Sequence, residues 1–258
     1  MTSHIASLPK RLHQHVLEEI GARIVRGEFA VGQALPVEDA LVAQLGVSRT
    51  VVREAVKVLS QKNLVEVRTR TGTRVRPSGK WNQLDPDILR WRFAGGFDAK
   101  LVEDVIDLRR IIEPAAAELA AARATPAMLD KLRAALHAMS DPSQVDEHIA
   151  ADLRFHLGIL EATGNALLLG LRHGIEGALS FAIGFSTRSK VEGLSSLALH
   201  ANVLRAIEQG HPAKARAAMD ALVERWADDS LRIVKSQRAK AQRAKRAASA
   251  NTVERIAA

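Results

Sequence analysis

One stretch in the middle of the chain carries side chains of the types that bind metal ions. Asp152 and His156 are four residues apart in the run Asp152-Leu-Arg-Phe-His156, a spacing that puts both on one face of a helix. A carboxylate and an imidazole placed in this way can bind one divalent cation, and His200 in a later predicted helix offers a third ligand. The spacing alone also fits a simple hydrogen bond between the two side chains, at the surface or in the core.

A second candidate for ligand binding is Arg109, in the run Asp107-Leu-Arg-Arg-Ile-Ile-Glu-Pro114. A guanidinium group presents parallel N–H donors, which suit a carboxylate bound through both of its oxygens. Glu113 follows four residues later in the same predicted helix, so an Arg109–Glu113 pair on the helix surface is the alternative. Arg109 is therefore expected to bind either a small carboxylate or its own helix neighbour.

Polar side chains near the N-terminus have the composition of a DNA-reading surface. Four of them begin a predicted helix and point away from its apolar positions: Ser48, Arg49, Thr50 and Arg53. Such groups reach guanine N7 and O6, or phosphate oxygens, from a helix in the major groove. Arg70, in a predicted hairpin, is available to the sugar-phosphate backbone. Each piece alone also fits plain packing or solvated surface, and it is the combination that favours DNA recognition.

The elements that hold these N-terminal groups follow from the hydrophobic pattern. Apolar residues recur at helical spacing over about residues 9–26, 37–45 and 49–59. Between the two short helices Gly46 permits a tight turn, and Ser48 is a good cap for the next helix. An alternating stretch at 64–75, turning near Gly72, predicts a two-stranded wing. Residues 8–77 are therefore expected to form a winged helix-turn-helix with three helices and a small β-hairpin.

The remainder of the chain reads as a connector, 78–97, followed by consecutive helices. Proline just inside helix starts and glycine just after helix ends separate them. The predicted helices span about 98–122, 126–139, 143–162, 165–186, 190–209 and 212–246. Over residues 98–234 we expect an all-α antiparallel bundle of six to seven helices, in which ligand sites lie between facing helices. The predicted fold class is mainly α.

Positive charge is concentrated at the two ends of the chain. Residues 1–80 carry 13 Lys and Arg against 7 Asp and Glu, residues 81–231 carry 16 against 21, and residues 232–258 carry 8 against 1. This distribution favours a polyanionic partner bound through the ends, with solvated basic surface as the alternative. The segment 235–258 has almost no large apolar residue, so we expect a frayed helical extension or a disordered tail there.

The composition and motifs also exclude several classes of function. The chain has no cysteine, which excludes disulfides, thiolate catalysis and cysteine-bound metal. We expect no enzyme, because no Ser-His-Asp order, Gly-rich phosphate loop or Glu-adjacent metal motif is present; a metal-dependent hydrolase using Asp152, His156 and His200 is the unlikely alternative. Without a signal peptide or a run of about 18 apolar residues, a cytoplasmic protein with no membrane contact is expected.

The N-terminal residues resemble the GntR family of bacterial transcription regulators. The resemblance rests on Ala34-Leu-Pro36, on Leu45-Gly-Val-Ser-Arg-Thr-Val-Val-Arg-Glu-Ala-Val-Lys-Val-Leu59 and on Gly72-Thr-Arg-Val75. It implies base and phosphate contacts by the four polar residues named above, with Gly72 at the wing tip in the minor groove. Many members have an arginine at one of two positions that are Asp39 and Ala40 here, so that phosphate contact is not expected in this chain.

The second half resembles the FadR-type helical ligand domain called FCD. Asp152, His156 and His200 fall where that domain has three metal ligands, and the position of its fourth, a histidine, is Leu222 here. The resemblance implies a divalent ion such as Zn, Ni or Mn, with water or ligand oxygens completing its shell, or a site without metal. Arg109 matches an arginine of the domain's first helix, so Arg109, Asp152, His156 and His200 are the predicted effector-binding residues.

The connector narrows the functional hypothesis. Its run from Trp81 to Trp91 resembles the connector of family members that repress sugar-acid (galactonate-type) operons. Together the resemblances imply a homodimeric repressor that binds double-stranded operator DNA and is released by a small carboxylate effector, an aldonate. Another organic acid such as lactate is the alternative effector. In a further alternative no effector binds, and the helical bundle serves only for dimerisation.

Overall fold

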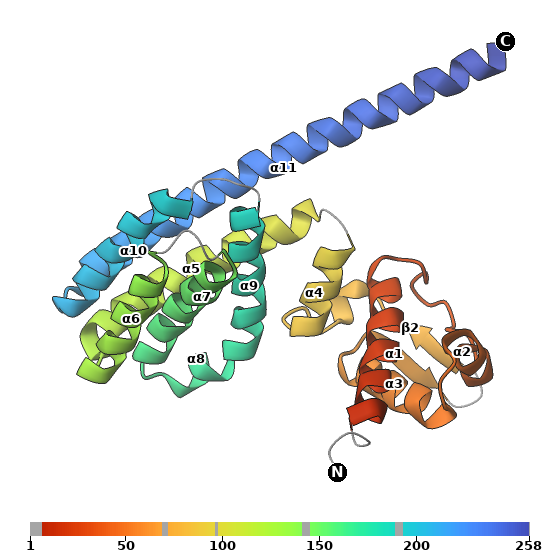
Figure 1. The fold of residues 1–258 in the computed structure, drawn as a ribbon, viewed down its shortest axis with the longest axis horizontal. Helices are drawn as coiled ribbons and strands as arrows, with labels where there is room; N and C mark the ends of the chain where they lie inside the picture. The colour runs from red at the N-terminus through yellow and green to blue at the C-terminus, as the bar shows by residue number, and fades with distance from the viewer. Residues whose placement is uncertain (1–6, 69–71, 96–97, 141–144, 189–192, 258) are drawn as a thin grey trace. The chain divides into compact units, whose positions relative to one another are not determined.

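The structure, a computed structural model, describes residues 7–68, 72–95, 98–140, 145–188 and 193–257, with side chains given at 12–68, 72–95, 98–140, 146–185 and 196–240. The chain divides into two compact units, residues 1–96 and 97–258, and each has its own hydrophobic core (Figure 1). Apart from one two-stranded sheet, the regular elements described are helices, which confirms the predicted fold class.

The first unit is a winged helix-turn-helix, as predicted. Its main elements are α1 (Ser7–Val25), α2 (Glu38–Leu45), α3 (Arg49–Gln61), β1 (Val65–Arg68) and β2 (Gly72–Val75). α2 ends at Gly46, which has a left-handed φ of 64°, and α3 begins after Ser48, whose hydroxyl accepts a hydrogen bond from the Val51 amide at 3.4 Å. The strands pair antiparallel with Val65 opposite Val75, which forms the wing.

The connector folds as part of the first unit. Asp85 caps a helix, α4 (Pro86–Ala94), that has proline in its first turn, and a short 3₁₀ turn, η1 (Ser78–Lys80), precedes it. Trp91 of α4 lies in the core of the first unit, against Gly21 of α1, and its indole N–H donates to the Glu18 carboxylate at 2.5 Å. α1 and α4 are therefore held together by both apolar packing and a hydrogen bond.

The second unit consists of α5 (Ala99–Arg123), α6 (Pro126–Ala138), α7 (Val145–Ala162), α8 (Ala166–Gly170), α9 (Arg172–Arg188), α10 (Gly193–Glu208) and α11 (Pro212–Ala257). α5 packs along α11, and α7 lies between α5, α6 and α9. The core consists mainly of aliphatic side chains, many of them alanine, with Phe155 at its centre and no exposed surface. Such small side chains allow helices to approach closely. The sequence predicted one helix over 165–186, where the structure has the short α8 and then α9.

α11 continues well past the core. Its last buried side chain among those described is Val234, and Arg238 forms an ion pair with Glu103 of α5 at 3.0 Å. The helix then runs on to Ala257, through the segment for which a frayed helix or disorder was expected. In the part of the chain that the structure describes, no helix has the length and apolar character needed to cross a membrane.

Candidate functional site

The predicted DNA-reading residues lie together on the outer face of the helix-turn-helix. Ser48, Arg49, Thr50 and Arg53 are all exposed, while the opposite face of α3 is buried in the core through Val52, Ala55 and Leu59. Gly72 begins β2, is exposed and has a φ of 80°, a backbone conformation that favours glycine. Arg70 lies outside the described residues.

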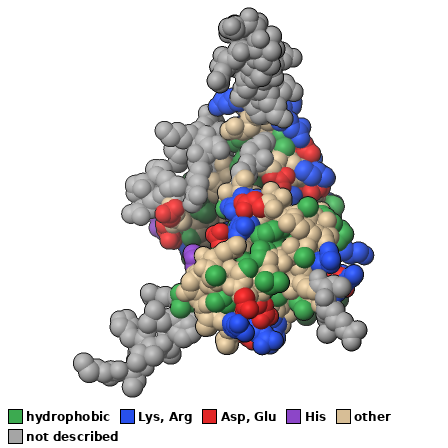
Figure 2. All heavy atoms as spheres, turned by 90° about the vertical axis from the view of Figure 1, so that its right-hand side faces the viewer, with side chains coloured by type: hydrophobic (Ala, Val, Ile, Leu, Met, Phe, Trp, Pro, Cys, Tyr) green, Lys and Arg blue, Asp and Glu red, His purple; other side chains and the backbone are tan. Residues whose placement is uncertain are grey.

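Two acidic residues of α2 pair with the two arginines of α3. The Arg49 Nη2 atom lies 2.9 Å from the Asp39 carboxylate, and the Arg53 Nε atom lies 3.3 Å from the Glu38 carboxylate. All four side chains are largely exposed. Acidic and basic side chains also lie next to one another on the face of the molecule that Figure 2 shows. The sequence analysis did not foresee these pairs.

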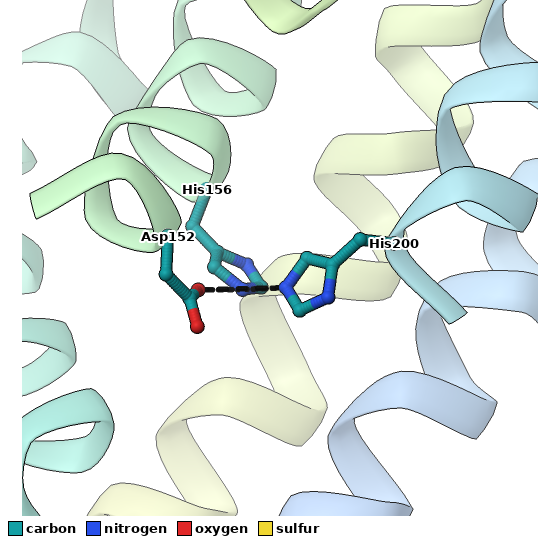
Figure 3. A group of neighbouring side chains, drawn as sticks. All are labelled: Asp152, His156 and His200. Carbon is teal, nitrogen blue, oxygen red and sulfur yellow. Dashed lines mark hydrogen bonds and ion pairs between the residues drawn. The ribbon is translucent and has the colours of Figure 1, made fainter. Parts of the chain in front are cut away.

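The three predicted metal ligands meet inside the second unit. Asp152 and His156 project from α7, and His200 projects from α10 toward them (Figure 3). The Asp152 Oδ1 atom is 3.1 Å from His156 Nε2 and 3.4 Å from His200 Nε2, and the two Nε2 atoms are 3.3 Å apart. His156 and His200 are both buried. One ligand atom from each residue therefore converges on the same small volume.

The neighbours of each Nδ1 atom indicate which nitrogen faces this volume. His200 Nδ1 lies 2.8 Å from the Ser196 carbonyl oxygen, which can only accept, so this Nδ1 carries a proton and the neutral ring presents a lone pair at Nε2. His156 Nδ1 lies 2.6 Å from the Glu113 carboxylate, an ion-pair contact that is not aligned as a hydrogen bond but favours a proton on this nitrogen. Asp152 Oδ1 is buried and makes no well-aligned hydrogen bond. A cation placed among these atoms, either a metal ion or a proton on His156, would satisfy them.

The charges around His156 favour its protonated form when no metal is bound. Burial lowers the pKa of His156, but the nearby carboxylates of Glu113 and Asp152 outweigh this effect and raise the pKa to about 9. Burial would raise the pKa of Glu113, yet Arg109 and His156 lower it to about 2. In the same way, His200 and His156 overcome the effect of burial and hold the pKa of Asp152 well below its usual range. Both carboxylates are therefore ionised at neutral pH.

Glu113 is the residue of this site that the sequence analysis missed as a participant. Its carboxylate accepts from Arg109 Nε at 2.5 Å and also faces His156 Nδ1, so the Arg109–Glu113 pair is buried and not on the helix surface. The available signal was the i, i+4 spacing, which does not say whether that face of α5 is covered. A carboxylate on the outer nitrogen of a metal-binding histidine fixes its ring and strengthens it as a ligand.

Arg109 lies next to the group of ligand atoms formed by Asp152, His156 and His200. Its Nη2 atom is 3.5 Å from His156 Nε2, and its guanidinium carbon lies 4.6 Å from the centre of the Trp226 ring of α11. Leu222, one helical turn before Trp226, is buried and supplies no ligand atom. The cavity bordering Arg109 and Glu113 has a volume of about 10 Å³, which is room for a single water molecule.

The donor set fits a divalent cation. Asp152, His156 and His200 form a group of ligand atoms that lie within 4.8 Å of one another, all from buried residues. Two imidazoles and a carboxylate are ligands that Zn²⁺ and neighbouring transition metals bind, and three protein ligands leave positions open for water or another oxygen donor. The orphaned Asp152 oxygen and the converging Nε2 lone pairs are the observations that carry this fit.

Both units match family models. Residues 12–75 match the model for bacterial regulatory proteins of the gntR family, and residues 104–225 match that for the FCD domain. An uncharacterized HTH-type transcriptional regulator of Mycobacterium tuberculosis is 30% identical over 233 residues, which cover 90% of this chain and 93% of that protein. The predicted regulator architecture is thereby confirmed at the level of the family.

A second relative and a solved structure extend the comparison. The galactonate operon transcriptional repressor of Escherichia coli is 35% identical over 150 residues, which cover 58% of this chain and 66% of that protein, slightly less than two thirds. The structure of Lar from Listeria monocytogenes is 19% identical with a TM-score of 0.57, covering 87% of this chain and 97% of that chain, and supports the fold alone.

Proposed function

The chain belongs to the gntR family of bacterial regulatory proteins and carries an FCD domain, and from this premise we propose that it is a homodimeric repressor whose operator binding responds to a small carboxylate. The family consists of transcription regulators and not of enzymes, in agreement with the absence of catalytic motifs. The observation that carries the proposal is that one chain contains both features: α3 of the first unit exposes two arginines, and the second unit contains a buried group of side chains that could bind a metal ion.

In this proposal α3 reads the operator. Arg49 and Arg53 stand one helical turn apart and neither contributes a core contact, so both exposed side chains can reach bases or phosphates beside their acidic partners on α2. Arg49, at the first position of the helix, is the proposed base reader, since the N-terminal residues of recognition helices contact base edges. Gly72 allows the wing backbone to approach the minor groove, and a dimer places two such helices on a two-fold operator.

Mutation of the two arginines tests the reading role. We expect Arg49→Ala and Arg53→Ala each to weaken operator binding by roughly tenfold or more at fixed salt, which corresponds to the loss of about 1 to 3 kcal/mol per contact. Lys57→Ala, from the same helix but further from its N-terminus, is the matched control. The measurement is a mobility shift on a duplex that the wild-type protein selects from a randomised library; unchanged affinity in both arginine variants would refute the assignment.

The second unit is proposed to sense the effector at Asp152, His156, His200 and Arg109. A bound divalent ion would act there as a Lewis acid that holds oxygen atoms of the effector. The guanidinium of Arg109 lies close enough to His156 Nε2 for an anion on that ion to contact it too. A hydroxy acid has both a carboxylate and neighbouring hydroxyls to fill the positions that Leu222 leaves open.

An aldonate such as galactonate or gluconate is the proposed effector. The similarity to the galactonate operon repressor and the connector from Trp81 to Trp91 support this class. An effector carboxylate that binds Arg109 competes with Glu113 for the guanidinium, so binding should be accompanied by a change in α5.

Calorimetry tests the effector site directly. The full chain is titrated with aldonates, uronates, lactate and acyl chains, after chelation and again with added Zn²⁺, Ni²⁺ or Mn²⁺. We expect metal-dependent aldonate binding that weakens at least tenfold in Arg109→Ala and in His156→Ala. Arg110→Ala, which removes the neighbouring exposed guanidinium that pairs with Glu224, should bind as the wild type does. Acyl-chain binding, or aldonate binding that survives both site variants, would refute this site.

A further inference from the structure

We propose that Asp39 is a specificity-determining residue of the DNA-reading surface. Its carboxylate holds the guanidinium of Arg49 ready for a base edge and repels the phosphates that the same guanidinium would otherwise bind. This inference rests on the proposed role of Arg49 in reading DNA.

The ion pair joins the two helices of the helix-turn-helix at their starts. Asp39 is the second residue of α2, Arg49 is the first residue of α3, and the distance from Asp39 Oδ1 to Arg49 Nη2 is 2.9 Å. Glu38 makes the corresponding contact with Arg53, one helical turn further along α3. Two adjacent carboxylates thus face two arginines on the surface that must approach the nucleic acid.

The pair does not hold the fold. The side chains of Asp39 and Arg49 are 66% and 70% exposed, and exposed ion pairs contribute between about 0 and 1 kcal/mol to stability. The two helices are joined instead by buried Leu41 and Val52, which lie in the same core. The consequence of the pair should therefore appear in DNA binding and not in the stability of the protein.

The carboxylate acts differently on the two kinds of DNA contact. Phosphate contacts give affinity to every sequence equally, because they depend on charge, and a neighbouring negative charge subtracts from them. A base contact depends on the direction of the guanidinium N–H groups. Arginine has five N–H donors, so one contact through Nη2 leaves the others available while limiting the rotation of the side chain. Asp39 should therefore widen the ratio between operator affinity and non-specific affinity.

The test compares Asp39→Asn with a charge-matched control in the full-length protein. Glu54→Gln removes the same charge from α3 itself, where Glu54 faces Lys57 at 3.8 Å. Affinities are measured by fluorescence anisotropy, at several salt concentrations, for the library-selected duplex, its single-base variants and a random duplex. For Asp39→Asn we expect about three- to tenfold tighter binding to random DNA with little gain on the selected duplex, so that discrimination falls by the same factor.

The control variants and the pattern of gains decide the inference. Glu54→Gln should tighten binding to all duplexes alike, and Asp39→Glu should keep the wild-type discrimination. An equal gain on every duplex for Asp39→Asn, or a changed melting temperature that accounts for it, would overturn the inference while leaving the reading by Arg49 intact. If Arg49→Ala discriminates among duplexes as the wild type does, the proposed reading itself fails, and the role of Asp39 fails with it.

Discussion

Among the individual residues, His156 is the one for which a proton and a metal ion compete, because each would bind the same ring nitrogen, Nε2. Glu113 holds one ring nitrogen, and the other faces Asp152 and His200. Without metal the second nitrogen is protonated, since the pKa is raised to about 9. Metal must therefore displace that proton, and its affinity should increase with pH up to about 9.

The same group gives the metal-free protein a predictable pH dependence. A histidine with a pKa near 6.5 when unfolded and about 9 when folded stabilises the fold fully below pH 6.5, and this contribution is lost as the pH rises through 9. In the presence of a chelator, we expect the free energy of unfolding to fall by about 1 to 3 kcal/mol between pH 7 and 10 relative to His156→Gln. Urea unfolding of both proteins across this range provides the measurement; an equal slope in the two would contradict it.

Sequence analysis recovered part of this site for a clear reason. The residue types that bind metals are rare in an aliphatic helical bundle, and two of them stand at i, i+4 spacing. The structure brings all three together: Asp152, His156 and His200. The role of Glu113 could not be read in the same way, because a glutamate four residues from an arginine looks identical whether α7 covers it or water does. The ion pair of Asp39 with Arg49 depends on how two helices cross, which no local pattern contains.

At the scale of elements, the connector helix α4 is fixed to α1 by a close contact. A Cβ atom at Gly21 would lie 2.4 to 2.7 Å from three atoms of the buried Trp91 ring, so an alanine there forces either this ring or α4 to shift. We expect Gly21→Ala to destabilise the first unit by about 1 to 3 kcal/mol, the usual cost of overpacking a core. Hydrogen exchange read by mass spectrometry should show faster exchange in α1 and α4, with peptides of α7 unchanged.

Gly79→Ala is the matched control for this prediction. Gly79 lies in the 3₁₀ turn just before α4, and a Cβ atom there would have no neighbour within 4 Å. Its exchange should resemble that of the wild type. If the two alanine variants behave alike, the contact between Gly21 and Trp91 does not hold the connector in place.

Some of the helices and strands could be predicted from the sequence and others could not. The winged helix-turn-helix was predicted because apolar spacing, a glycine turn and an alternating hairpin all agree there. α4 was not predicted although Asp85-Pro86 is a strong helix start, since the helix is only nine residues long and has apolar side chains on too few turns to set a clear period. The break between α8 and α9 falls after Gly170, and this glycine was the one local signal for it, within a run of leucines that continues the apolar pattern of a single helix.

For the molecule as a whole, the basic C-terminal extension is a second segment that could contact the phosphates of DNA. Residues 236–258 carry six Lys and Arg against one Glu, and α11 continues as a helix to Ala257. We expect deletion of this segment to make the salt dependence of DNA binding less steep by about one unit or more of the logarithmic slope, without loss of discrimination among single-base variants. Arg238→Gln, which removes the pair with Glu103, is the control for lost helix packing. An unchanged slope after deletion means that the extension does not touch DNA.

The two separate cores have one more consequence, which concerns communication. Each is built from its own set of residues, so we expect the chain to unfold in two transitions, and a ligand of the second unit to raise that unit's transition by mass action. Any shift that the same ligand causes in the transition of the first unit measures the coupling free energy between the sites. Reciprocity requires operator DNA to shift the second transition by an equal free energy. A calorimeter would thus quantify the allosteric link without any knowledge of how the units are oriented.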